Sequence, residues 1–175
     1  MTDKISYGFQ HPENLEAMDA IRTTAQAKGY SVQPLQMLLK NKTLRKEKIS
    51  PTEYPNAVFR YLGLEDLESD TGKTTGYHEM LGIQIRSTSL LFYLGDILFA
   101  RLRPYLNKVY LVTQEDSDTP IPSSGDERQD IRQQQTIGSG EFYVIDPDTQ
   151  QVEPNFLHKY LLSQLTLTQT KWILS

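Results

Sequence analysis

The side chains with the clearest potential for chemistry follow the apolar run Ile97-Leu98-Phe99-Ala100. They combine guanidinium, phenol, amide and ammonium groups within one short turn. A guanidinium donates two parallel hydrogen bonds to guanine, an amide pairs with adenine, an aromatic ring stacks on a base and an ammonium contacts phosphate. This turn therefore predicts contact with DNA, through the candidates Arg101, Arg103, Tyr105, Asn107 and Lys108.

A polar loop earlier in the chain, residues 65–76, supplies a second group of candidates. Its cationic and hydroxyl side chains could form a variable reading surface, and one arginine further along adds another cation. These candidates are Lys73, Thr74, Thr75 and Arg86.

A structural interpretation of the turn stays open beside the functional one. In it, Arg103-Pro104-Tyr105 only fixes the backbone, Lys108 pairs with Asp96, and specificity lies in residues 70–77. A motif shared by domains that read many different sequences would then be scaffold or phosphate contact.

Catalytic motifs are missing from the sequence. Gly72-Lys73-Thr74 lacks the glycine that a phosphate-binding loop needs at position 67, which is Leu67. No lysine follows an acidic residue by two positions, as a common magnesium-dependent nuclease requires, and no methyltransferase motif occurs. Gly138-Ser139-Gly140 lacks the spacing of a nucleophile elbow. We expect no catalytic residues.

Metal and cofactor sites are not expected either. The chain has no cysteine, and its histidines, His11, His78 and His158, show no metal-ligand spacing. The absence of cysteine suits a reducing compartment, and no signal peptide or spanning segment is visible. We therefore expect a cytoplasmic protein without a membrane association.

The charge is unevenly distributed. The net charge is −4, but residues 1–112 hold 14 lysines and arginines against 12 acids, whereas residues 113–175 hold 4 against 10. Because binding of nucleic acid requires cations to neutralise phosphates, a DNA-binding face should lie in the first two thirds of the chain.

The apolar pattern predicts an α+β fold, with a twisted, mostly antiparallel β-sheet and flanking helices. Residues 1–50 form an N-terminal helical segment and residues 51–175 the main domain, with a mobile polar loop at 114–137. The expected helices begin at Pro12, Pro34 and Pro154. The expected strands are 58–64, 81–86, 90–94, 96–102, 108–112 and 141–145.

Several of these segments together resemble the target recognition domain of type I restriction-modification specificity subunits, in a single-domain or truncated form. The resemblance covers residues 58–165. It is carried by Tyr61-Leu62-Gly63-Leu64, by Gly95-Asp96-Ile97-Leu98-Phe99, by Arg103-Pro104-Tyr105-Leu106-Asn107-Lys108-Val109 and by Gly138-Ser139-Gly140-Glu141-Phe142-Tyr143-Val144-Ile145. A second domain and the long helices of a whole subunit are not visible.

The resemblance implies a DNA-binding, non-catalytic module that directs a partner adenine methyltransferase subunit and a restriction (translocase and endonuclease) subunit to double-stranded DNA. A homodimer that restores a two-part target is a further option. Two alternatives stay open: a protein-interaction or vestigial scaffold module without DNA reading, and a detached C-terminal recognition domain of a fused DNA methyltransferase.

Overall fold

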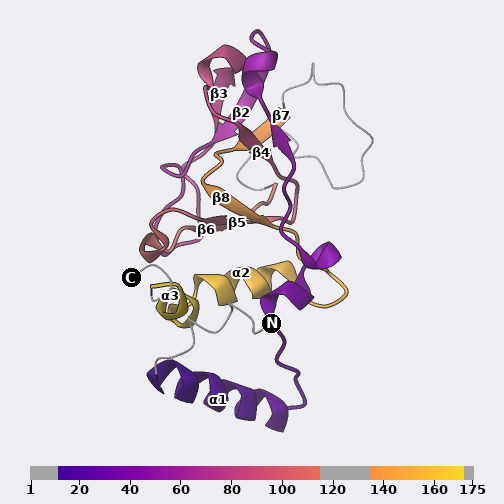
Figure 1. Ribbon diagram of the computed structural model, residues 1–175, viewed down its shortest axis with the longest axis vertical. Helices are drawn as coiled ribbons and strands as arrows, with labels where there is room; N and C mark the ends of the chain where they lie inside the picture. The colour runs from indigo at the N-terminus through magenta and orange to yellow at the C-terminus, as the bar shows by residue number, and fades with distance from the viewer. Residues whose placement is uncertain (1–11, 115–134, 172–175) are drawn as a thin grey trace, which may run out of the picture.

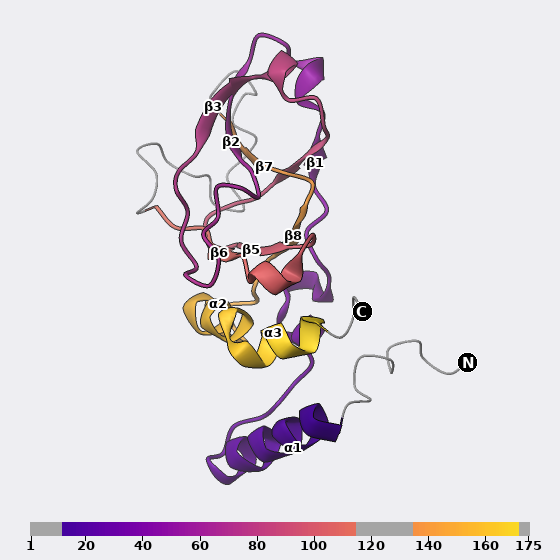
Figure 2. The ribbon, with the colours of Figure 1, turned by 90° about the vertical axis from the view of Figure 1, so that its left-hand side faces the viewer.

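The computed structural model describes residues 12–114 and 135–171. Two β-sheets are stacked along the long axis of the molecule, and helices cover the outer face of the smaller sheet (Figure 1). Turned by 90°, the same layers remain distinct (Figure 2). The α+β fold predicted from the sequence is confirmed, with its strands divided between two sheets.

The larger sheet has five strands in the order β1-β4-β7-β2-β3. Every pairing is antiparallel except that of β2 with β7, which is parallel. The strands are β1 (Lys48–Ile49), β2 (Val58–Leu62), β3 (His78–Leu81), β4 (Ser89–Leu91) and β7 (Gln135–Gly138).

The smaller sheet has the antiparallel order β6-β5-β8. Its strands are β5 (Ile97–Ala100), β6 (Val109–Leu111) and β8 (Phe142–Ile145). Both faces of this sheet are covered, which explains the nearly continuous apolar runs in its strands. Along β5, for example, Ile97 faces the helices and Leu98 faces the larger sheet.

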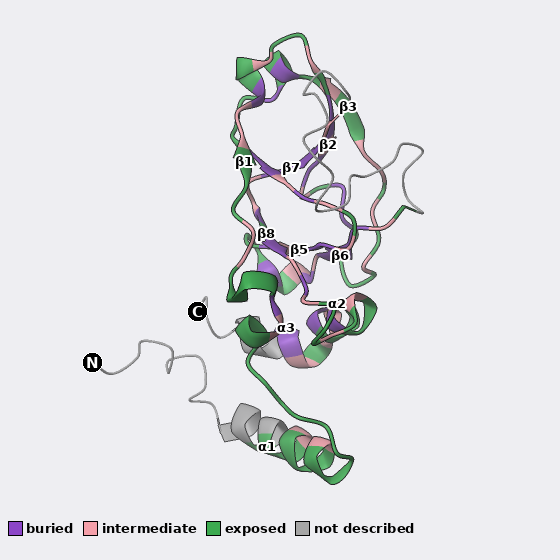
Figure 3. Cartoon of the chain, turned by 90° about the vertical axis from the view of Figure 1, so that its right-hand side faces the viewer, coloured by how far each residue is buried: buried purple, intermediate pink, exposed green. Residues whose placement is uncertain are grey.

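The core has three parts. One lies between the two sheets and contains Leu62, Phe92 and Tyr110, and a second lies between the smaller sheet and the helices. The third packs on the outer face of the larger sheet around Phe59 and Ile137. Buried residues therefore concentrate on the strands and on the inner side of the helical layer (Figure 3).

The helices are α1 (Pro12–Ala27), α2 (Pro154–Leu162) and α3 (Gln164–Lys171). Short 3₁₀ helices are η2 (Leu35–Leu38), η3 (Lys40–Lys42), η4 (Pro51–Glu53), η5 (Gly82–Gln84) and η6 (Pro104–Leu106). Glu153 caps α2 by accepting a hydrogen bond from the amide of Phe156. Leu157 and Leu161 of α2 are buried against the smaller sheet.

Three expected elements differ in the structure. The helix expected at Pro34 is only the four-residue 3₁₀ helix η2. The alternation of residues 81–86 predicted a strand, but the strand β3 ends at Leu81 and η5 follows, leaving Ile83 63% exposed. The alternating apolar residues of 81–86 therefore do not form one buried face of a strand, since of these only Ile85 is buried. The predicted loop at 114–137 ends earlier than expected, because Gln135 already begins β7; its residues 115–134 lie outside the described parts of the chain.

Residues 39–49 pack on the main body of the fold. Leu39 belongs to the core beneath α2, and β1 is an edge strand of the larger sheet. A domain boundary at residue 50 therefore falls directly after a paired strand. The residues that lie apart from the sheets in Figures 1 and 2 are those of α1 and the extended segment after it.

Candidate functional site

The turn between β5 and β6 presents three of the candidate side chains to solvent. Arg103 and Asn107 flank η6 with left-handed backbone conformations, at φ values of 50° and 48°. Such conformations cost non-glycine residues on the order of 1 kcal/mol each, so tertiary contacts must hold this turn. Arg101 and Arg103 are exposed, and Tyr105 is 57% exposed. No described residue forms an ion pair or side-chain hydrogen bond with either arginine.

The other two candidates of this turn are used inside the fold. The buried Asn107 donates through Nδ2 to Asp70 Oδ1 at 2.9 Å and to the Leu162 carbonyl at 2.8 Å. Lys108 Nζ donates to the Leu64 carbonyl at 2.9 Å and Asp96 pairs with Arg45, so the Lys108–Asp96 pair of the structural interpretation is wrong. DNA contact by the Asn107 amide would require its two bonds to break, whereas the Lys108 ammonium has two further donors beside the one that Leu64 uses.

The loop between β2 and β3 is anchored to the same turn. The amide of Asp70 donates to the Asn107 carbonyl at 3.2 Å, in addition to the side-chain bond between these residues. Gly72, at φ +72°, lies so close to α2 that an added Cβ would meet the His158 ring at 2.7 Å. The two predicted groups of candidates, apart from Arg86, therefore meet at the helical end of the molecule.

Within this loop, Thr74 and Thr75 are tied to Asp66. Their hydroxyl groups donate to the Asp66 carbonyl at 3.0 and 3.2 Å, and the Thr75 amide donates to it at 2.8 Å. Lys73 is exposed and has no ion pair with a described residue. Hydrogen bonds to Asp66 thus fix the backbone of this loop, and Lys73 remains exposed to solvent.

Arg86 lies apart from the other candidates. It follows η5, which packs on η4 at the end of the larger sheet most distant from α2 and α3 (Figures 1 and 2). Its side chain is exposed. One surface that includes Arg86 together with the turn at 101–108 would have to extend along the whole two-sheet body.

The structure reveals a histidine–carboxylate pair that the sequence pattern did not predict. His78 Nε2 lies 2.7 Å from Asp66 Oδ1, while Asp66 Oδ2 accepts from the Gly63 amide at 2.7 Å. The Asp66 side chain is 5% exposed and that of His78 is 61% exposed. Twelve positions separate the two residues across a loop, so no local spacing could have indicated the pair.

A second unpredicted cluster surrounds Arg45. Its guanidinium contacts Asp96, Asp146 and Glu47, and it lies 4.7 Å from the centre of the Tyr93 ring. Burial lowers the pKa of Arg45, but the neighbouring carboxylates outweigh burial and raise it above the ordinary value. Burial, reinforced by Glu47, raises the pKa of Tyr93 to about 12. This cluster joins separate segments of the chain.

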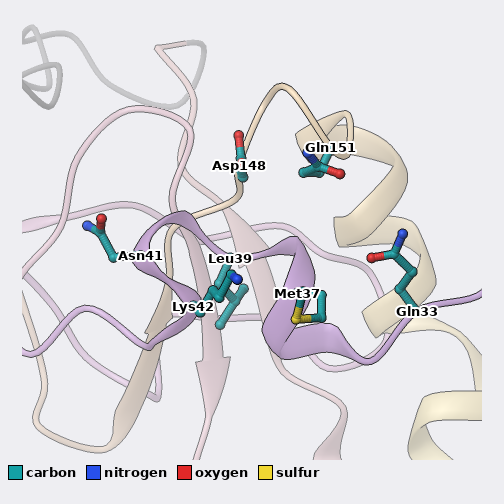
Figure 4. A pocket seen from close by; sticks show the side chains of 7 residues that line it. All are labelled: Gln33, Met37, Leu39, Asn41, Lys42, Asp148 and Gln151. Carbon is teal, nitrogen blue, oxygen red and sulfur yellow. The ribbon is translucent and has the colours of Figure 1, made fainter.

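A shallow hollow of about 370 Å³ lies between the η2–η3 region and the segment before α2 (Figure 4). None of the predicted candidates lines it. Its lining residues are Gln33, Met37, Leu39, Asn41, Lys42, Asp148 and Gln151. Their mixture of amides, one lysine and one carboxylate contains no nucleophile–base pair.

In residues 12–114 and 135–171, no cluster of three or more histidine, aspartate or glutamate side chains could hold a metal ion. Over the same ranges, no helix combines the length and apolar character needed to cross a membrane.

The fold and the exposed cationic turn define a class of protein: the chain resembles the target recognition domain of type I restriction-modification specificity subunits, as the sequence motifs predicted. Over 64 residues it is 41% identical to the type I restriction enzyme EcoDI specificity subunit of Escherichia coli. The matched segment makes up 37% of this chain and 14% of that protein. No family model matches the chain.

Solved structures show the same similarity. The HsdS subunit of Thermoanaerobacter tengcongensis is 26% identical, with a TM-score of 0.54, over 71% of this chain and 27% of that one. A chain from a structure on complex assembly and conformational transition of the type I R-M system is also 26% identical. Its TM-score is 0.57, over 77% of this chain and 31% of that one. The chain thus spans less than a third of these relatives.

Proposed function

We propose that this chain is a DNA-reading domain of a type I restriction-modification system. In this role it binds a defined double-stranded sequence and directs a partner methyltransferase subunit and a restriction subunit to it, while chemistry takes place in those partners. The similarity of most of the chain to solved chains of type I systems carries the proposal.

The local geometry supports reading at the helical end of the molecule. Arg101, Arg103 and Lys73 are exposed cations on the turn and loop that Asn107 and Asp70 join. A rigid turn that presents guanidinium groups suits bidentate recognition of guanine in the major groove. Buried Asn107 and half-buried Lys108 hold the turn and, in this proposal, contribute by positioning the arginines.

The proposal is tested by mapping methylated adenines at single-base resolution in cells that produce a type I methyltransferase subunit with and without this chain. A methylated motif that depends on the chain is expected. No new motif, with a methyltransferase that is active with another specificity subunit, would overturn the proposal and favour an interaction or scaffold module.

A variant separates reading from assembly. Arg101→Gln/Arg103→Gln removes two exposed guanidinium groups without disturbing a described hydrogen bond of their side chains. Loss or relaxation of the motif, with co-purification of the methyltransferase retained, is the expected result. An unchanged motif would exclude these arginines as readers. A detached domain of a fused methyltransferase would instead direct methylation only when joined to that enzyme.

A further inference from the structure

Residues 39–49, here called the edge segment, bridge the two sheets. Leu39 pairs with Pro147 and Arg45 with Val144 of β8, after which Lys48 pairs with Leu90 of β4. The segment runs along one side of the molecule from the helical end to the larger sheet (Figure 1). The turn at 101–108 joins the ends of β5 and β6 and lies on the opposite side of the molecule in the same view (Figure 1).

Side chains alternate along the last part of the edge segment. Arg45 and Glu47 contact one another and Tyr93, and Ile49 packs on the core around Phe59. Lys46 and Lys48 fall between them and are exposed. Since alternate residues of an extended chain share a face, the two lysines lie on the same face, roughly 7 Å apart.

The charge of these lysines is not neutralised within residues 12–114 and 135–171. Lys40, Lys42, Lys46 and Lys48 are all exposed, and none forms an ion pair with a described residue. The carboxylates that contact the edge segment, Glu47, Asp96 and Asp146, are already bonded to Arg45. A local excess of positive charge results in a chain whose net charge is −4.

We propose that Lys46 and Lys48 contact the phosphate backbone of double-stranded DNA and form a sequence-independent surface distinct from the turn at 101–108. This inference rests on the proposed DNA-reading function. Their spacing of roughly 7 Å is close to twice the axial distance between phosphates of one strand. Such contacts supply affinity and fix orientation but carry no sequence information.

Lysines on an edge strand also have a purely structural use, because they prevent two sheets from pairing edge to edge. Neutral but polar substitution distinguishes the two roles. If Lys46 and Lys48 only protect the edge, Lys46→Gln/Lys48→Gln will promote association between chains and leave the salt dependence of DNA binding per chain unchanged.

The test measures binding of the full chain to a fluorescent 30-base-pair duplex of mixed sequence, across a series of salt concentrations. Each phosphate contact contributes about −0.9 to the slope of log K against log salt concentration. The variant Lys46→Gln/Lys48→Gln should therefore bind with a slope less negative by about 1.8. Lys28→Gln/Lys159→Gln, which changes the same charge at exposed positions elsewhere, should retain the wild-type slope.

The outcomes are distinct. If the wild-type chain binds the duplex and Lys46→Gln/Lys48→Gln binds it with the same salt slope, this inference is overturned and the reading function is left intact. If the salt slope becomes less negative by the same amount in both double variants, the inference is also overturned. The overall charge of the chain, and not the position of the lysines, would then set the affinity. Absence of any duplex binding by the wild-type chain counts against both. Restoration of the slope by Lys46→Arg/Lys48→Arg is expected.

Discussion

Arg45 and Asp96 form a two-pronged ion pair although 51 positions separate them, with Nε 3.1 Å from Oδ2 and Nη2 3.3 Å from Oδ1. The Asp96 side chain is 2% exposed and that of Arg45 is 11% exposed. Asp96 Oδ2 also accepts from the Tyr93 amide at 2.8 Å, which closes the turn before β5. One carboxylate therefore fixes a turn and attaches the edge segment to the core.

Removal of Arg45 should destabilise the fold strongly. Arg45→Ala leaves the buried Asp96 carboxylate without its cation, and breaking a buried pair in this way costs about 3–5 kcal/mol. Urea unfolding measures the change. Arg22→Ala is the control, because Arg22 and Asp19 form an exposed pair on α1 and should contribute less than about 1 kcal/mol. Equal effects of the two substitutions would contradict a special role for Arg45.

Asp96 should make stability fall as pH rises from about 4 to about 6. Burial raises the pKa of Asp96 to about 6 and Arg45 only partly opposes this, because the carboxylate is the more deeply buried partner. In this window the folded state binds more protons than the unfolded state, so the free energy of unfolding decreases with pH.

The measurement compares the wild type with Asp96→Asn from pH 4 to pH 7. The free energy of unfolding of the wild type relative to this variant should decrease by up to about 3 kcal/mol, since each pKa unit corresponds to about 1.4 kcal/mol. If this difference in the free energy of unfolding stays constant or grows with pH, the pKa of Asp96 is not raised in the folded state.

His158 should act in the opposite direction. Its Nε2 lies 3.2 Å from the Val109 carbonyl, and burial lowers the pKa of the ring below its ordinary value. The unfolded chain then binds a proton first, so stability is lost as the pH falls below about 6.5. Thermal unfolding measured between pH 5 and pH 7 should show that His158→Gln loses less stability than the wild type as the pH is lowered. An equal loss of stability in the two chains would show that His158 does not cause it.

Gly72→Ala should destabilise the loop between β2 and β3. The backbone at φ +72° disfavours alanine by about 1 kcal/mol or more, and the new Cβ would meet the His158 ring at 2.7 Å. Part of this loss should disappear in the double variant Gly72→Ala/His158→Ala, compared with His158→Ala alone. Additive effects in urea unfolding would show that the ring and the loop are not coupled.

The candidates at 101–108 should separate into exposed readers and internal supports. Asn107→Ala loses bonds to Asp70 and Leu162 and places alanine at φ 48°, so we expect a loss of about 2 kcal/mol or more. Asn107→Gly tolerates this φ, which separates backbone strain from the lost bonds.

Arg101→Gln/Arg103→Gln should change stability by less than about 0.5 kcal/mol, since both side chains are exposed and have no side-chain bond to a described residue. Urea unfolding measures this change, and the methylation map measures the effect on reading. A large loss of stability in the double arginine variant would place these residues among the supports.

Local sequence by itself determined the elements that bury apolar side chains continuously and the helices with proline near their start. Strands β5, β6 and β8 and the helix at Pro154 could be predicted because propensity and burial agree there. The motifs around Gly95 and Arg103 likewise sufficed to indicate the resemblance.

Tertiary structure decided the pairings between distant segments. Strand β7 begins in the polar sequence Gln135-Thr136 and is a strand because it pairs in parallel with β2, a long-range contact without a local signal. Asp96 pairs with Arg45 and not with Lys108, which donates to the Leu64 carbonyl instead. Chain topology, rather than spacing in the sequence, brings these groups together. For the same reason only the fold showed that Asn107 is buried while Arg103, four residues earlier, is exposed.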